Sequence, residues 1–202
     1  CCFDDIILKS HSKTVPYHTD YIDDISNMIL QQEIKLDSWD EKAQPWLQRY
    51  HNFQKYFHES EHLNFDQDDL LILIQEALES IKNWKDLFKI DWPTLFSSAL
   101  SWDEQQSFEK NFPEYYTLKK GRRVKIQYFE DQNPKISSKL QDFYDQTPHP
   151  SICSNKLKLS CELLAPNQRP VQTTQDIVGF WDSSYPQVKK DLFRRYPKHE
   201  WR

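Results

Sequence analysis

Hydrophobic residues in the first half of the chain recur at intervals of three and four, the spacing that places them on one side of an α-helix. Within residues 19–35 the recurring positions are Ile22, Ile25, Met28 and Ile29. A second stripe, within residues 38–57, contains Trp46, Leu47, Tyr50, Phe53 and Phe57. The pattern predicts two amphipathic helices, and Pro45 either kinks the second helix or delays its start.

A third stripe predicts a helix from about Asp68 to Asn83. Ser38 and Glu41, like Ser101 and Glu104, have the spacing of a capping box, in which side chains pair with free backbone N–H groups at a helix start. We therefore expect helices to begin near Ser38 and near Ser101, and we expect the first half of the chain to be helical.

Beyond Pro113 the hydrophobic period changes from helical to alternating. In residues 122–129 every second residue is hydrophobic, namely Val124, Ile126 and Tyr128. Residues 134–140 are read as a second strand, and residues 156–165 alternate in the same way. These segments predict strands, of which the first has one buried face and one polar face.

Two short helices are expected at the end of the chain. Thr173 and Asp176 are placed to cap the first, and Ser184 with Gln187 is placed to cap the second. The whole pattern predicts an α+β fold, with an N-terminal helical half followed by a small, mostly antiparallel sheet and two terminal helices.

Charge divides the chain in the same way as the hydrophobic pattern. Residues 1–110 contain 10 Lys and Arg against 21 Asp and Glu, whereas residues 111–202 contain 16 against 10. The acidic residues of the first half fit the solvent faces of its helices. The basic second half suggests either a surface that faces a polyanion or two halves that face each other.

Glycine is nearly absent, because only Gly121 and Gly179 occur in 202 residues. A phosphate-binding loop needs two glycines five positions apart, and a dinucleotide-binding fingerprint needs three close together. The sequence therefore excludes both of these nucleotide-binding motifs.

The longest unbroken aliphatic run, Leu70 to Ile74, is five residues long, far short of the ~20 that a membrane helix requires. The first residues do not have the pattern of a signal peptide. We expect a cytoplasmic chain without a membrane span, cut from a longer protein. The four cysteines, Cys1, Cys2, Cys153 and Cys161, lack the spacing of a zinc site and are expected to be free thiols.

One short motif suggests a different class of protein. Residues 58–62, HESEH, match the pattern in which two histidines bind zinc and a glutamate activates water. A third ligand would be needed, and Glu76 or Glu79 could supply it. The match lies where a helix is expected to end, so a solvated helix end is the favoured interpretation and no metal ligand is assigned.

Four motifs follow one another in the last third of the chain: RPVQTTQD, GFW, SSYPQVKK and RYPKHEW. With these motifs the sequence resembles the C-terminal region of bacterial HrpB-type DEAH-box ATP-dependent helicases. The resemblance covers residues 66–202, divided into a helical part (66–115) and an α+β part (116–202). Residues 1–65 would then form a helical segment leading into this module, as a linker or as the end of the preceding helicase domain.

The resemblance implies a longer protein with two RecA-like motor domains, in which ATP and Mg²⁺ would bind. It implies no catalytic residue and no cofactor in this chain, which would be a non-catalytic accessory module. Its expected partners are single-stranded RNA or another nucleic acid, and the motor domains of the same protein.

Basic residues of the second half are candidates for contacts with a nucleic-acid backbone, since neutralised phosphates release counterions and give affinity without sequence preference. The candidates are Lys119, Lys120, Arg122, Arg123, Arg169, Lys189, Lys190, Arg194, Arg195 and Lys198. Tyr185, Tyr196 and Trp201 could stack on bases if they are exposed.

Two alternatives remain open. Asp191 could pair with Arg194 or Arg195, and Phe193 could belong to the core with Phe180, Trp181 and Tyr196, in which case the module is structural or docks a protein. The third and least favoured class is a zinc-dependent hydrolase built on residues 58–62.

Overall fold

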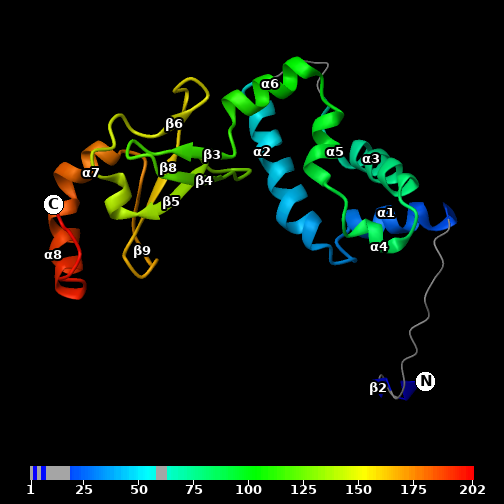
Figure 1. Ribbon diagram of the computed structural model, residues 1–202, viewed down its shortest axis with the longest axis horizontal. Coiled ribbons are helices and arrows are strands. Elements are labelled where there is room, and N and C mark those ends of the chain that lie inside the picture. Colours follow the sequence, from blue (N-terminus) through cyan, green and yellow to red (C-terminus); the bar gives the residue numbers. More distant parts are fainter. Residues whose placement is uncertain (1, 4–5, 8–18, 58–62) are drawn as a thin grey trace.

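A computed structural model describes residues 2–3, 6–7, 19–57 and 63–202 (Figure 1). Two short strands, β1 (Cys2–Phe3) and β2 (Ile6–Ile7), pair antiparallel near the N-terminus. The rest of the described chain forms an arch, with helices at one end and a sheet with its terminal helices at the other. This arrangement confirms the predicted α+β fold and the order of its parts.

The helical half is built from short elements. They are the 3-10 helix η1 (Thr19–Tyr21), α1 (Ile22–Leu30), the π-helix η2 (Trp39–Ala43), α2 (Gln44–Gln54), α3 (Gln67–Ser80), α4 (Trp84–Leu87), α5 (Trp92–Ser98) and α6 (Trp102–Asn111). The amphipathic stripes predicted at 19–35 and at 68–83 correspond to α1 and α3, which pack against each other.

Aromatic rings fill the core of the helical half. Trp46 and Tyr50 on α2 stack with 5.3 Å between ring centroids, and Phe65, Phe96 and Phe108 pack edge-on or tilted around them. Such edge-to-face pairs add to the stabilisation that burial itself provides. The predicted aromatic stripe is therefore the side of α2 that faces the core.

Helices begin at both expected positions, after Ser38 and after Ser101, but only Ser101 forms the predicted side-chain cap. The Ser101 hydroxyl accepts the Glu104 N–H at 3.3 Å, as a capping box requires. The Ser38 side chain makes no cap and instead accepts a hydrogen bond from the Trp92 indole. A π-helical turn comes first, and α2 begins only at Gln44, with Pro45 in its first turn. Pro45 therefore lies where the π-helical turn passes directly into α2.

The sheet has five strands in the order β3-β4-β5-β8-β9, of which only β5 and β8 run parallel. Their bounds are β3 (Tyr115–Thr117), β4 (Arg123–Gln127), β5 (Lys135–Lys139), β8 (Ser160–Leu164) and β9 (Pro170–Thr174). The strand predicted at 156–165 is divided between β8 and β7 (Leu157–Lys158), which pairs separately with β6 (Ser151–Ile152). The alternating hydrophobic residues of the predicted strand are nevertheless all buried, namely Leu157, Leu159, Cys161 and Leu163.

One face of the sheet forms the core of the second half. Val124, Ile126, Ile136, Cys161 and Leu163 on this face are all buried. The 3-10 helix η3 (Leu140–Phe143) follows β5, and the terminal helices α7 (Ile177–Ser183) and α8 (Tyr185–Arg195) pack through Trp181 and Tyr185 against Tyr144. Cys153 and Cys161 are free thiols, as expected, and burial raises the pKa of Cys161 to about 12.

Three side chains spaced one turn apart along α2 and its C-cap bind backbone oxygens, one at the end of α6 and two in the segment after β4. The Arg49 guanidinium donates to the backbone oxygen of Phe112, the Asn52 amide donates to that of Phe129 at 2.9 Å, and the Lys55 ammonium donates to that of Glu130. The bonds of Asn52 and Lys55 therefore connect the helical half to the sheet. No helix in the described part of the chain has both the length and the apolar character needed to cross a membrane.

Candidate nucleic-acid interface

The turn between β3 and β4, together with the first residue of β4, carries four of the predicted cations. Lys119, Lys120, Arg122 and Arg123 are all exposed around Gly121. The Gly121 backbone has φ +82°, in the left-handed region that glycine adopts at least cost, and its N–H donates to the Leu118 oxygen at 2.8 Å. One of the two glycines in the chain therefore shapes this basic turn.

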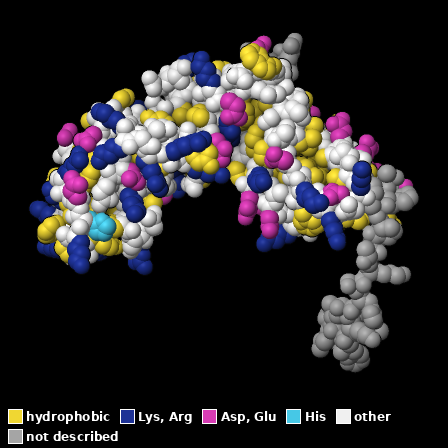
Figure 2. Space-filling view, viewed as in Figure 1, with side chains coloured by type: hydrophobic (Ala, Val, Ile, Leu, Met, Phe, Trp, Pro, Cys, Tyr) yellow, Lys and Arg dark blue, Asp and Glu magenta, His cyan; other side chains and the backbone are white. Residues whose placement is uncertain are grey.

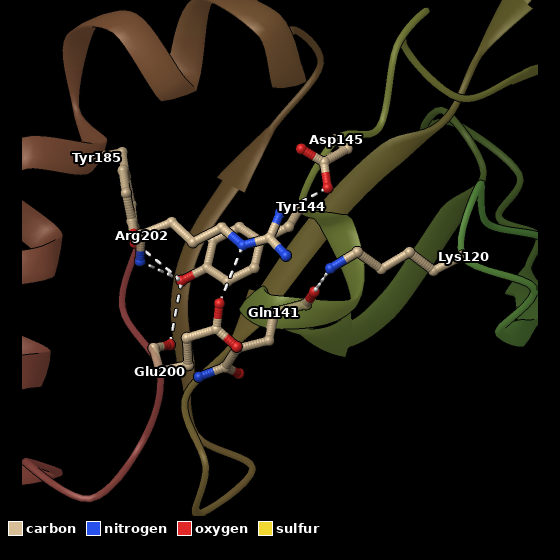
Figure 3. Close-up of polar contacts among 7 residues, drawn as sticks. All are labelled: Lys120, Gln141, Tyr144, Asp145, Tyr185, Glu200 and Arg202. Atoms are coloured by element: carbon tan, nitrogen blue, oxygen red, sulfur yellow. Dashed lines mark hydrogen bonds and ion pairs between the residues drawn. The ribbon is translucent and has the colours of Figure 1, made fainter.

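Lys120 makes structural contacts (Figure 3). Its ammonium group lies 5.0 Å from the centre of the Tyr144 ring and donates to the Gln141 backbone oxygen at 3.3 Å. The C-terminal Arg202 reaches the same ring, with its guanidinium carbon 5.2 Å from the ring centre. Tyr144 thus connects the basic turn to the end of the chain, and Lys120 is the predicted residue with a clear structural role.

The remaining polar contacts of the C-terminal segment hold it against η3. Arg202 forms ion pairs with Asp145 at 2.6 Å and with Glu200 at 3.1 Å, and these two carboxylates raise the pKa of its guanidinium, Glu200 most. The Trp201 indole donates to the Tyr196 backbone oxygen at 2.9 Å. The chain after α8 therefore folds back onto the module.

Helix α8 and the residues after it carry five predicted cations, which are Lys189, Lys190, Arg194, Arg195 and Lys198. Lys189 is half-buried and the other four are exposed. Within the described part of the chain none of the five forms a salt bridge, and Asp191 pairs with neither arginine. The alternative of an intrahelical pair is therefore not realised, and the charges of this group are available to a partner.

The aromatic residues of the terminal helices were assigned partly in error. Tyr185 is buried, so it cannot stack on a base, whereas Phe193 was expected in the core and is 56 % exposed. Tyr196 and Trp201 are half-buried and pack against the core. The helical period explains both errors, because Tyr185, Val188 and Leu192 form the inward stripe and Phe193 lies about 100° away from Leu192.

Arg169 lies in the turn between β8 and β9 and is exposed. It is not positioned at the start of α7, because its own backbone oxygen accepts the Ala165 N–H in that turn. The start of α7 is occupied by Asp176, whose carboxylate accepts the Gly179 N–H at 3.0 Å. The structure therefore gives no phosphate site formed by Arg169 and α7.

The sheet face opposite the core is a basic surface that sequence reasoning missed. We call it the open face, and it consists of Tyr115, Thr117, Arg123, Lys125, Gln127, Lys135, Ser137 and Lys139 on β3, β4 and β5. Figure 2 shows several Lys and Arg side chains gathered over these strands, where the arch is hollowed. The signal was present in the alternation of residues 122–129, which already assigned Arg123, Lys125 and Gln127 to the polar side.

Acidic residues neutralise only part of this surface. Lys135 pairs with Glu162 of β8 at 3.2 Å, and Lys125 lies 3.7 Å from Glu114. Hydrogen bonds from Ser137 and Lys135, together with the charge of Lys135, keep the pKa of the Glu162 carboxyl below its usual value. In the described residues Arg123 and Lys139 have no acidic partner.

The zinc motif, residues 58–62, lies outside the described residues. Its candidate third ligands, Glu76 and Glu79, both lie on α3 and are exposed. Among the described residues, no group of three or more histidine, cysteine and acidic side chains is placed to hold a metal ion.

Comparison with known proteins assigns the family. A family profile described as the ATP-dependent helicase C-terminal domain, HrpB_C, matches residues 73–202. The chain belongs to this family. The HrpB-type C-terminal domain thus accounts for most of α3, all of α4 to α6, the sheet and the terminal helices.

Relatives agree with this assignment. The chain is 32 % identical over 140 residues to the ATP-dependent RNA helicase HrpB of Escherichia coli strain K12, an alignment that covers 67 % of this chain and 17 % of that protein. Its fold is similar to the crystal structure of the E. coli DExH-box NTPase HrpB, with a TM-score of 0.76 and 27 % identity over 98 % of this chain. A second crystal structure, of the E. coli DEAH/RHA helicase HrpB, gives a TM-score of 0.69 over 91 % of this chain.

The chain spans only part of these relatives. It covers 25 % and 23 % of the two crystallised chains. The match to the first nevertheless extends to nearly all of this chain, beyond the residues that the family profile covers.

Proposed function

We propose that this chain is a non-catalytic accessory domain of an ATP-dependent RNA helicase and that it contacts the nucleic-acid backbone. The observation that carries the proposal is the group of five cations on and after α8, none of which has an acidic partner in the described structure. Unpaired exposed cations neutralise phosphates without the cost of first breaking an ion pair. Contacts of this kind do not depend on sequence, which suits a protein that moves along a strand.

The proposal leaves ATP hydrolysis to the rest of the longer protein. ATP and Mg²⁺ would bind in its motor domains, since this chain lacks the glycines of both nucleotide-binding motifs. The motor domains and a single-stranded RNA are the proposed partners, and a cytoplasmic location is part of the same proposal.

A salt titration tests the backbone contact. Fluorescence anisotropy of a labelled single-stranded RNA is measured against the wild-type chain and an Arg194→Gln/Arg195→Gln variant from low to moderate salt. For single strands the logarithm of affinity falls with the logarithm of salt concentration by about 0.7 per neutralised phosphate, so the variant's slope should be smaller by about 1.4. A Lys82→Gln/Lys85→Gln variant is the matched control, because it removes the same charge from exposed positions of the acidic half.

The slopes decide the outcome. A reduced slope for the α8 variant with an unchanged slope for the control supports a phosphate contact at α8. Equal slopes in all three proteins would contradict that contact, and absence of RNA binding at low salt would overturn the proposed function as a whole.

Protein docking is the second candidate, and one observation favours it. The helical half exposes large apolar side chains, since Trp102 is 72 % exposed and Phe88 is 62 % exposed. Aromatic side chains such as these are enriched at protein–protein interfaces relative to the rest of the surface. If docking is the function, this chain binds the separately purified motor domains, and a Phe88→Ser/Trp102→Ser variant binds them more weakly.

A further inference from the structure

The open face is organised around one aromatic ring. Tyr115 of β3 is 36 % exposed, and the guanidinium carbon of Arg123 lies 4.2 Å from its ring centre. The two residues are diagonal neighbours, because Tyr115 pairs with Lys125 and Thr117 pairs with Arg123 in the β3–β4 ladder. Such neighbours on one sheet face are within reach of long side chains. The strand register therefore places the guanidinium over the ring.

The outer side of this pair is available to a ligand. Arg123 is exposed, and its side chain forms neither a hydrogen bond nor an ion pair within the described structure. A planar guanidinium can stack on a ring on one side and on a nucleobase on the other. The Tyr115–Arg123 pair thus has the composition and geometry of a platform for one base.

A groove continues from the platform toward the helical half. It has a volume of about 760 Å³ and lies between the sheet and the start of α2. Lys125, Gln127 and Lys135 of the open face form its sheet side, and Lys42 and Gln48 contribute to its helix side. Two acidic residues, Glu41 and Glu114, also line it, so its cations outnumber its carboxylates without excluding them. Arg49 and Asn52 help to hold α2 in place there through their bonds to backbone oxygens of Phe112 and Phe129. The groove is therefore a fixed feature that adjoins the platform at Lys125.

We propose that the open face binds single-stranded nucleic acid, with a base stacked on the Tyr115–Arg123 pair and the backbone following Lys125 and Lys135 into the groove. This inference rests on the proposed function and adds to the contact at α8 a second site, on the sheet, that binds a base as well as the backbone. The charge of the open face favours a polyanion. In the described structure only two of its four cations have an acidic partner, because Lys125 pairs with Glu114 and Lys135 pairs with Glu162.

The platform selects single strands over duplexes. Bases inside a duplex already stack on each other and are not available to a protein ring, whereas the bases of a single strand are free to stack on aromatic side chains and on Arg. Base stacking also tolerates any sequence, since every base has a flat face. The open face is therefore expected to recognise strand type and not base identity.

The test compares strand types and uses a ring variant. Anisotropy is measured with a labelled single-stranded RNA and with the duplex of the same sequence, using the wild-type chain, Tyr115→Leu and Tyr115→Phe. Removal of one stacking ring weakens single-strand binding by about 5- to 150-fold. We expect a loss in that range for Tyr115→Leu with an unchanged salt slope, and near wild-type affinity for Tyr115→Phe, which keeps the ring. Tyr21→Leu is the matched control, because Tyr21 is a similarly exposed tyrosine of the helical half and should not affect binding.

A cross-linking measurement on the wild-type chain does not depend on how a variant folds. Single-stranded RNA that contains bromouridine is irradiated with the protein, and the modified peptide is identified by mass spectrometry. A cross-link at Tyr115 supports the platform.

Three outcomes would overturn it: a cross-link only at other residues, equal affinity for duplex and single strand, or an unchanged affinity for Tyr115→Leu. If RNA still binds with a steep salt dependence in these cases, the proposed backbone contact stands. If no RNA binds, the proposed function fails as well.

Discussion

The hydroxyl groups of Tyr144 and Tyr185 lie 2.8 Å apart in the interior of the second half of the chain, where they form a hydrogen bond. Tyr144 follows η3 and Tyr185 is the first residue of α8, so this bond attaches the terminal helix to the segment after the sheet. Burial is the main cause that raises the pKa of Tyr185, and the hydrogen bond to Tyr144 raises it further. The basic residues of α8 are thus carried by a helix with a fixed position.

Removing the Tyr185 hydroxyl should loosen this attachment. In a Tyr185→Phe variant the Tyr144 hydroxyl loses its short partner and keeps a contact with the Glu200 backbone oxygen at 3.4 Å. We expect the free energy of unfolding to fall by about 1 kcal/mol and the melting temperature by about 2–4 °C. Calorimetry measures this shift. Tyr56→Phe is the control, since the hydroxyl of the exposed Tyr56 makes no hydrogen bond in the described structure, and an equal shift for both variants would contradict the role of the Tyr144–Tyr185 bond.

Arg49 should contribute to stability mainly through the Phe112 carbonyl. Its guanidinium is buried and lies 4.2 Å from the Phe108 ring centre, whereas its acidic partner Glu109 is 57 % exposed. Arg49→Met leaves the Phe112 oxygen without this donor and should cost about 1–3 kcal/mol, but Glu109→Gln removes an ion pair with a solvated partner and should cost less than about 1 kcal/mol. Urea unfolding of both variants measures the difference, and a larger loss for Glu109→Gln would show that the ion pair dominates.

The hydrophobic pattern was sufficient to predict several helices and strands, but not the contacts that their side chains make with distant parts of the chain. Helical and alternating periods predicted α1, α3 and β4 because each of these elements buries one side against a core, whereas the start of α6 came from the capping-box spacing of Ser101 and Glu104. The missing cap at Ser38 was not predictable from spacing, since the Ser38 hydroxyl instead accepts a hydrogen bond from the indole of Trp92, a residue 54 positions away. Long-range contacts of this kind are not encoded in a local period.

The candidate site was predictable in composition and not in arrangement. The sequence identified the basic residues of the second half, but it did not show that Lys120 would lie on Tyr144 or that Arg123 would stack on Tyr115. Both contacts depend on strand register and on where η3 and the C-terminal segment pack. For the same reason the polar side of β4 was visible in the sequence, whereas its position beside the groove was not.

Acid should remove the stabilisation that Glu162 provides. The Ser137 hydroxyl donates to its carboxylate at 2.6 Å and holds the pKa of the folded state below that of the unfolded chain, with a further contribution from Lys135. The contribution is therefore complete above the unfolded-state pKa, about 4.3 for glutamate, and is lost as pH falls through the lower folded-state value. We expect the difference in unfolding free energy between wild type and Glu162→Gln to be largest near pH 7 and to shrink below about pH 4. Urea titrations at several pH values measure it, and a difference that does not change with pH would contradict the argument.

Gly121 should be the least replaceable residue of the basic turn. Its φ of +82° lies in a region of backbone conformation that is unfavourable for residues with a Cβ atom. The space around it is open, since a Cβ atom at this position would have no heavy atom within 4 Å apart from those of the adjoining residues. Gly121→Ala should therefore cost about 1–2 kcal/mol through backbone strain alone. Gly121→Asn should cost less, because asparagine visits this conformation more readily.

Thermal unfolding measures both Gly121 variants. Since strain and not a clash is the cause, equal losses for alanine and asparagine would contradict the left-handed turn. A loss of RNA affinity in Gly121→Asn larger than its loss of stability would show that the turn itself contacts the strand, because the substitution leaves the four cations around it unchanged.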